Sequence, residues 1–292
     1  MSSQLVPLIL SGIALGAIYA IVALGFVLVI KATGVLNFAH GYFLMLGGYL
    51  AVTFLVRLDF GLIAGFLAIS VIMALYGVGF HYGLMQWMIG KPFFSVVLVT
   101  VGMEILIRAG LLIYYGPVEF GRLNKMPSGG VTVADTFVSN VNIIIFATAF
   151  VIVGAFFLFF RFSRMGLHMR AVADNLEASA AVGITPNRVY ALAWAIGLVL
   201  AGIGGVLYGH FHSSVDLGMA AVGLRAFPAA ILGGIDSVQG AIIGGIIVGL
   251  VETLGAGFFG AQWRDVIAFG IMFLVLLWRP SGLFGSKEVV RV

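Results

Sequence analysis

Residues 1–30 read MSSQLVPLILSGIALGAIYAIVALGFVLVI and contain no charged side chain. A bilayer core about 30 Å thick is crossed by a helix of roughly 20 apolar residues, so this stretch predicts a first membrane span. The whole chain has a similar composition, because 62% of its 292 residues are hydrophobic and only 9% are charged. A soluble domain carries about 25% charged residues. The composition therefore excludes a soluble enzyme, a disordered chain and a nucleic-acid-binding protein.

Further apolar stretches, separated by short polar ones, predict the remaining spans. They are Ala32–Val56, Phe60–Gly90, Pro92–Tyr115, Val141–Phe160, Val189–Gly209, Ala226–Ile235, Val238–Phe259 and Val266–Trp278. Ala226–Ile235 is short and carries Pro228, so it is either part of a broken span or a re-entrant segment. The prediction is a single all-α, polytopic membrane domain over residues 1–292. It has about 8–9 transmembrane helices, one or two of them discontinuous or re-entrant.

The basic residues predict which side of the membrane each loop faces. With the N-terminus outside, one side receives Lys31, Lys91, the loop 161–188 and the tail, which together hold nine Lys and Arg residues. The other side receives five: Arg57, Arg122, Lys125, Arg225 and Arg264. An excess of Lys and Arg marks the cytoplasmic side. The loop 161–188 and the C-terminus are therefore predicted to be cytoplasmic.

Glycine makes up 41 of the residues, and many glycines lie four apart, as in Gly12/Gly16 and Gly245/Gly249. Small residues at this spacing let helices in a membrane approach closely, which predicts ordinary helix packing. A functional interpretation is open for Gly233-Gly234, where irregular backbone could line a wet cavity beside Pro228. Gly34–Leu50 and Gly223–Gly245 also resemble each other weakly, which indicates either an internal repeat or chance similarity.

Four polar side chains within the apolar stretches are candidates for a translocation pathway. Glu104 and Arg108 lie four apart, the spacing of a same-face helical pair, and charges in a membrane demand an explanation. They either neutralise each other structurally or contact the two ends of a zwitterionic substrate. Asn37 and His40 would likewise either hydrogen-bond between helices or line the pathway.

The loop 161–188 has the pattern of a short helix pair. Asp174 and Glu177 have the spacing of a capping box, and Gly183 stands where a left-handed residue would end the helix. Thr185-Pro186 then predicts an N-cap followed by proline at the first position of the next span. Such a helix between two turns is suited to docking in a groove of another protein.

The stretch Glu177-Ala178-Ser179-Ala180-Ala181-Val182-Gly183 resembles the E-A-A-x-x-x-G motif of permease subunits in bacterial ATP-binding-cassette importers. It departs from that motif at Ser179 and lacks the distal I-x-L-P. Together with Arg170–Ala180, Leu36–Gly41 and Ala230–Gly234, it resembles the branched-chain amino acid permease family over nearly the whole chain. The length is similar to that of the smaller, H-type permease subunit.

This resemblance implies a membrane subunit that imports branched-chain or other hydrophobic or neutral amino acids across the bacterial inner membrane. The implied partners are a second, related permease, two cytoplasmic ATPase subunits and a periplasmic binding protein. The loop would contact the ATPase through Arg170, Asp174, Glu177, Ala178, Ala181 and Gly183.

The chain itself is expected to be no enzyme, to bind no cofactor or metal and to hydrolyse no nucleotide, because no phosphate-binding loop is present. The same family resemblance extends to permeases for urea, amides or aromatic acids, so these substrates are an alternative to amino acids. A secondary transporter or channel is a further alternative function.

Overall fold

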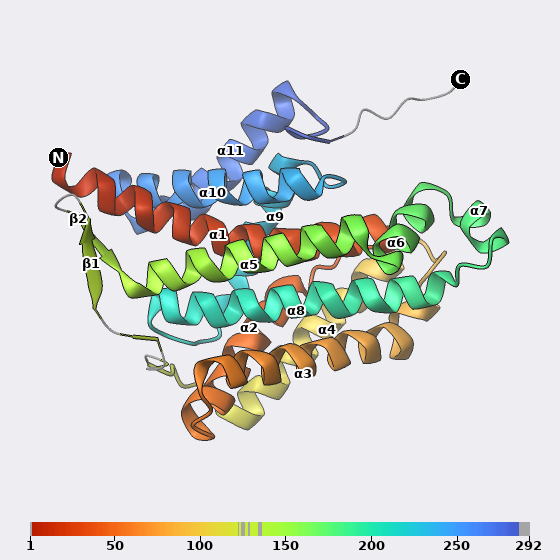
Figure 1. Ribbon diagram of the computed structural model, residues 1–292, viewed down its shortest axis with the longest axis horizontal. Coiled ribbons are helices and arrows are strands. Elements are labelled where there is room, and N and C mark those ends of the chain that lie inside the picture. Colours follow the sequence, from red (N-terminus) through yellow and green to blue (C-terminus); the bar gives the residue numbers. More distant parts are fainter. Residues whose placement is uncertain (1, 122, 124–125, 128, 134–135, 286–292) are drawn as a thin grey trace.

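The computed structural model describes residues 2–121, 123, 126–127, 129–133 and 136–285 of the chain (Figure 1). Eleven α-helices occupy most of the described part. They are α1 (Ser2–Thr33), α2 (His40–Ala51), α3 (Leu62–Gly83), α4 (Phe93–Tyr115), α5 (Asn140–Phe162), α6 (Arg164–Asp174), α7 (Leu176–Ala181), α8 (Pro186–His212), α9 (Met219–Gly233), α10 (Val238–Phe259) and α11 (Arg264–Trp278). A short hairpin of β1 (Gly130–Val133) and β2 (Thr136–Ser139) precedes α5.

Seven helical segments are long and apolar enough to cross a membrane: those built on α1, α3, α4, α5, α8, α10 and α11. Two further helices are shorter: α9 (Met219–Gly233) corresponds to the short segment predicted at Ala226–Ile235, whereas α2 (His40–Ala51) lies in the stretch Ala32–Val56 that was predicted as a full span. The helix α2 is prolonged by a π-helical stretch, Val52–Arg57, and α9 is 15 residues long and contains Pro228. The predicted all-α, polytopic membrane architecture is confirmed.

The core of the bundle is formed by α1 and α8. Within their apolar windows 89% and 83% of the residues are buried, against 33% or less in the other five spans. Apolar faces that remain exposed on α3, α4, α5 and α11 suit lipid or a neighbouring membrane protein, since no water has to be excluded there. The two long central helices therefore organise the rest of the bundle.

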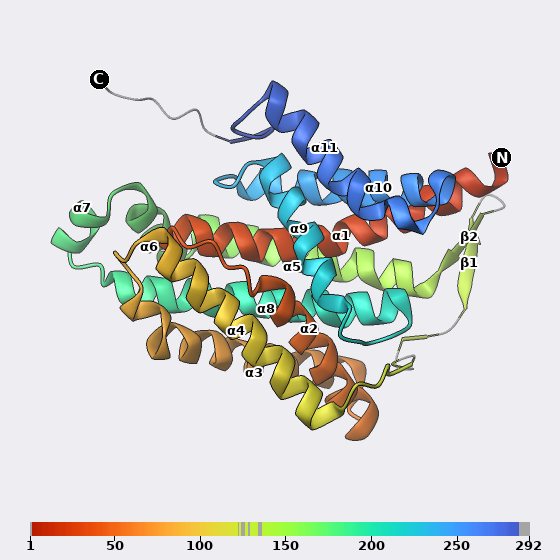
Figure 2. The same ribbon diagram turned by 180° about the vertical axis from the view of Figure 1, so that it is seen from behind.

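Two sets of three helices, α1–α3 and α8–α10, pack in a reciprocal way. The helix α1 packs mainly against α10, and α8 packs mainly against α3, while the short helices α2 and α9 cross each other between them (Figure 2). This arrangement supports an internal repeat, but in a different register from the one predicted. The spatial counterpart of α2 is α9, so the connection that matches residues 34–39 is 213–218 rather than the region after Gly223.

Glycines permit these helix crossings, as their spacing predicts. A Cβ on Gly205 of α8 would lie 1.9 Å from the carbonyl oxygen of Leu44 on α2. A Cβ on Gly223 of α9 would lie 2.1 Å from the Cα of Gly41 on α2. Both distances are far below van der Waals contact, so the backbones could not approach this closely with any larger residue.

The elongated bundle has two distinct ends, which we name the α7 end and the hairpin end. At the α7 end lie the C-terminus of α1, the helices α6 and α7, and the start of α10; the β-hairpin marks the other (Figures 1 and 2). Residues 283–284 also lie at the α7 end, where their amides bond to the carbonyls of Leu232 and Gly233. Of the basic residues assigned to the opposite side, Arg122 and Lys125 lie outside the described residues.

Candidate functional sites

The predicted helix pair in the loop 161–188 is present as α6 and α7, separated by a sharp turn. The cap of α7 differs from the prediction, because the side chain of Asn175 accepts the hydrogen bond from the amide of Ala178 at 2.9 Å. Asp174 instead ends α6. Both residue types cap helices well, so spacing alone could not decide which of these neighbours would do so.

The end of α7 follows the prediction closely. Gly183 has a φ of +87°, a left-handed conformation that favours glycine, and its amide bonds to the carbonyl of Ala180. Thr185 is the N-cap of α8, with Pro186 in its first turn. These two turns hold α7 away from the bundle as a short projecting helix, which is visible in Figure 1.

Five of the six predicted contact residues lie on one exposed surface, which we call the α7 surface. Its members are Asp174, Glu177, Ala178, Ala181 and Gly183. Beside them Val182 is 78% exposed and Leu176 is 44% exposed. Ser179 is the buried residue of the helix, and its hydroxyl bonds to the carbonyl of Leu176. A small apolar surface with one carboxylate pair at its edge is well suited to fit a groove.

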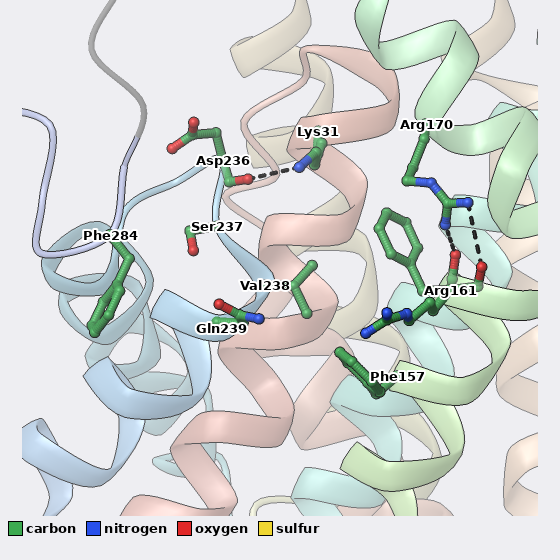
Figure 3. Close-up of a pocket in the computed structure, with 10 residues that line it drawn as sticks. Lys31, Phe157, Arg161, Arg170, Asp236, Ser237, Val238, Gln239 and Phe284 are labelled. Atoms are coloured by element: carbon green, nitrogen blue, oxygen red, sulfur yellow. Dashed lines mark hydrogen bonds between the residues drawn. The ribbon is translucent and has the colours of Figure 1, made fainter.

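Arg170, the sixth predicted residue, does not belong to this surface. Its guanidinium donates hydrogen bonds to the carbonyl oxygens of Phe160 and Arg161 and lies 5.4 Å from the Phe160 ring centroid (Figure 3). Those carbonyls end α5, where a cation also complements the helix dipole. Arg170 therefore fixes α6 against α5 and positions α7 indirectly.

Asn37 and His40 are fully buried where the connection after α1 meets the start of α2. The Nε2 atom of His40 is 3.0 Å from the carbonyl oxygen of Val22, but its Nδ1 has no partner within the described residues. Both amide atoms of Asn37 also lack a partner there. Buried polar atoms without hydrogen bonds cost about 1–3 kcal/mol each, so they mark a place where a further polar group fits.

These two side chains line an apolar pocket of about 220 Å³ between α1, α2, α9 and α11. Its other walls include Phe26, Phe227 and Phe269. A second pocket shares Leu36 and Phe227 with the first and extends toward the α7 end, past Ile235 and Asp236. Together they form a groove on the face carrying α2, α9 and α11, which is turned to the viewer in Figure 2.

The proline and glycines of α9 take different roles. Pro228 has no amide hydrogen, so the carbonyl of Leu224, a residue that lines the apolar pocket, loses its usual helical partner. Gly233 instead packs on Gly240, since a Cβ on Gly233 would lie 2.0 Å from the carbonyl oxygen of Gly240. Gly234, with φ of +111°, makes the turn before α10. The two glycines are thus explained by packing and turn geometry.

Glu104 and Arg108 lie on α4 at the edge of the bundle. Both side chains lie near the Tyr42 hydroxyl on α2. Glu104 is half-buried and Arg108 is exposed. The structure therefore places them near Tyr42 and not at the apolar pocket between α1, α2, α9 and α11, where Asn37 and His40 are buried.

One buried polar cluster was not predicted from the sequence. Glu252 of α10 is 1% exposed and accepts a 2.7 Å hydrogen bond from Tyr19 of α1. Arg225 of α9 lies 3.7 Å from the same carboxylate and 2.5 Å from Asp265 of α11. Arg225 was assigned to an outer loop, which is wrong, because it lies within the bundle and joins three helices. The available signal was a single glutamate inside the apolar run Val238–Phe259.

The fold and these sites define a polytopic membrane protein with a largely apolar groove that holds two buried polar side chains, and with a projecting helix at one end. Among the described residues no group of three or more His, Asp or Glu side chains could hold a metal ion. The family described as "Branched-chain amino acid transport system / permease component" matches residues 8–276. The chain belongs to this family.

Similar proteins extend over nearly the whole chain. It is 32% identical over 297 residues to the high-affinity branched-chain amino acid transport system permease protein BraD of Pseudomonas aeruginosa, covering 97% of each chain. It is 32% identical to LivH of Escherichia coli K12, covering 97% of this chain and 96% of that one. The chain is also 27% identical to LivM, the high-affinity branched-chain amino acid transport system permease protein of E. coli K12. The match covers 91% of this chain and 67% of LivM. No solved structure matches the chain.

Proposed function

We propose that the chain is a membrane-spanning permease subunit of an ATP-binding-cassette importer for branched-chain or other hydrophobic amino acids. The observation that carries this proposal is the 32% identity to BraD and LivH over 97% of the chain. Both are named as permease proteins of high-affinity branched-chain amino acid transport systems. In this proposal separate subunits use the ATP, and this chain has no enzymatic activity and binds no cofactor.

The α7 surface is the proposed contact with an ATPase subunit. A rigid helix held between two turns transmits movement better than a flexible loop, because Asn175 and Gly183 fix both of its ends. Arg170 joins the preceding helix α6 to α5 through the carbonyls of Phe160 and Arg161. Movement of the ATPase would thereby pass from α7 through α6 to the spanning helix α5. In this proposal the α7 end is cytoplasmic and the N-terminus of the chain is outside.

The groove on the face carrying α2, α9 and α11 is the proposed half of the translocation pathway. A second, related permease would complete it, as the presence of LivM beside LivH in E. coli supports. Asn37 and His40 supply polar atoms in an otherwise apolar wall, which suits a substrate with an apolar side chain and polar ends. Whether the second permease is a copy of this chain or a different protein is decided by co-purification.

The test is leucine uptake by the reconstituted transporter, prepared with its ATPase subunits, second permease and binding protein in proteoliposomes. We expect uptake of labelled leucine that requires ATP and the binding protein. Uptake by this chain alone, driven by an ion gradient, would instead indicate a secondary transporter. Competition by urea, amides or aromatic acids, with no competition by isoleucine or valine, would assign it to another substrate class.

A further inference from the structure

A pocket of about 590 Å³ lies at the α7 end, across the C-terminal turn of α1. Figure 3 shows its walls: Lys31 of α1 is in the middle, Arg161 and Phe157 of α5 are on one side, and Ser237, Val238 and Gln239 at the start of α10 are on the other. Arg170 borders it from α6 and Phe284 from the C-terminal segment. A second pocket of about 680 Å³ continues from Lys31, Arg170 and Asp236 along α6.

Three cationic groups face this pocket, and none of them has a carboxylate oxygen within 4 Å among the described residues. The ammonium of Lys31 donates a 2.9 Å hydrogen bond to the backbone carbonyl of Asp236. Arg170 donates hydrogen bonds to the two carbonyls that end α5. Arg161 contacts the rings of Phe157 and Phe162, at 5.8 and 5.5 Å from their centroids. Asp236 carries a carboxylate nearby, which points away from Lys31 in Figure 3.

The start of α10 adds to the positive potential. Ser237 caps this helix by accepting a 3.0 Å hydrogen bond from the amide of Gly240. The N-terminus of a 22-residue helix carries a partial positive charge, and Ser237, Val238 and Gln239 bring it to the wall of the pocket. The pocket therefore combines three cations with a helix N-terminus, which favours a bound anion.

The surroundings indicate that this anion belongs to a lipid. The helix α5 is only 17% buried along its apolar window, and Phe157 and Phe162 beside the pocket are 39% and 72% exposed. An exposed apolar helix face that ends in a cluster of basic residues matches the boundary between acyl chains and headgroups. Basic pockets between membrane helices are typical sites for anionic headgroups.

We propose that this pocket binds the phosphate group of an anionic phospholipid, with Lys31, Arg161 and Arg170 around the headgroup and the acyl chains along α5. A bound lipid would join α1, α5, α6 and α10 at the point where α7 begins. The inference goes beyond the proposed transport function and does not depend on which substrate is carried.

Native mass spectrometry of the purified transporter complex tests this proposal. The probe is phosphatidylglycerol, compared with phosphatidylcholine of the same acyl chains and with inorganic phosphate. We expect selective phosphatidylglycerol adducts on this chain. Arg161→Gln removes a cation that makes only ring contacts within the described part of the chain, so we expect the fold to be retained and phosphatidylglycerol binding to weaken about fivefold. Adding Lys31→Gln should weaken it by about fivefold again.

Lys91→Gln serves as the matched control, because Lys91 is an exposed cation in the connection between α3 and α4, outside this pocket. It should leave phosphatidylglycerol binding unchanged. Three results would each overturn the proposal: equal binding of the two lipids, equal weakening by Lys91→Gln, or displacement of phosphatidylglycerol by inorganic phosphate. If the permease binds the lipid without its partners but the complete complex does not, the pocket is instead a contact for a partner subunit.

Discussion

Tyr19 on α1 donates a 2.7 Å hydrogen bond to the carboxylate of Glu252 on α10, a residue 233 positions later in the chain. The same carboxylate lies 3.7 Å from Arg225 on α9. One buried acid thus holds together the central helix, its principal neighbour and the short helix that carries Pro228. In a membrane interior such a bond has no competing water, and its loss leaves a buried group unsatisfied.

Tyr19→Phe is expected to lower the stability of the purified protein by about 1 kcal/mol, since one donor to Glu252 is lost. Glu252→Ala should cost more, about 2–3 kcal/mol, because Tyr19 loses its acceptor and Arg225 loses one of its two carboxylate partners. Thermal unfolding in detergent, followed by size-exclusion fluorescence, measures both changes. Tyr82→Phe is the control, as that ring is 40% exposed. Equal melting temperatures for the Tyr19 and Glu252 variants would contradict this account.

Gly205→Ala is expected to prevent close packing of α8 on α2, because a Cβ would lie 1.9 Å from the Leu44 carbonyl oxygen. The cost of overpacking is about 1–3 kcal/mol or more. The yield of monodisperse protein after membrane extraction reports the effect. Gly154→Ala is the matched control, since a Cβ on Gly154 meets nothing within 4 Å. A normal yield for the Gly205 variant would show that the two helices do not lie this close.

Glu177→Arg and Gly183→Ala are expected to separate ATP hydrolysis from leucine uptake in the reconstituted transporter. The first reverses the charge at the edge of the α7 surface. The second strains a residue whose φ is +87°, at a cost of about 1–2 kcal/mol. Uptake per ATP hydrolysed should fall about tenfold while membrane insertion is normal, since about 1.4 kcal/mol lost from the contact corresponds to this factor. Full uptake in both variants would remove α7 from the coupling contact.

Leu224→Trp is expected to block the apolar pocket that Asn37 and His40 line, because Leu224 is 48% exposed at its edge and the pocket holds about 220 Å³. Leucine uptake should fall strongly while the complex assembles normally. Phe273→Trp, on an exposed part of α11, is the control. Asn37→Ala should lower uptake as well, whereas wild-type uptake in the Asn37 and Leu224 variants would place the pathway elsewhere.

Local patterns predicted the local structure well. The apolar runs predicted the spans, and Gly183 and Pro186 fixed the end of α7 and the start of α8, because caps depend on residues a few positions apart. The prediction of Asp174 as the cap of α7 was wrong, since the cap depends on where α6 ends. The roles of the six residues assigned to the ATPase contact stay predictions.

Relationships between distant segments were not predictable from one sequence. Glu252 has no acidic or basic neighbour within its own helix, so nothing nearby indicated that Tyr19 and Arg225 would meet it. Arg225 directly precedes the stretch Ala226–Ile235 that was predicted as a membrane segment, so it was mistaken for a loop residue. The basic pocket likewise joins Lys31, Arg161 and Ser237, which lie more than 70 residues apart in sequence. Only the fold brings such residues together.

The central position of α1 has a consequence for how the protein is made. At a synthesis rate of about 5–20 residues per second, the ribosome needs about 12–47 s to pass from Tyr19 to Glu252. During that interval α1 lies in the bilayer without the helix that later covers it. Because residues 1–30 carry no charged side chain, α1 can lie in the bilayer alone without the free-energy cost of a buried charge. Arg225 and its two partners, Glu252 and Asp265, all emerge within 40 residues, so each can meet its partner soon after it is synthesised.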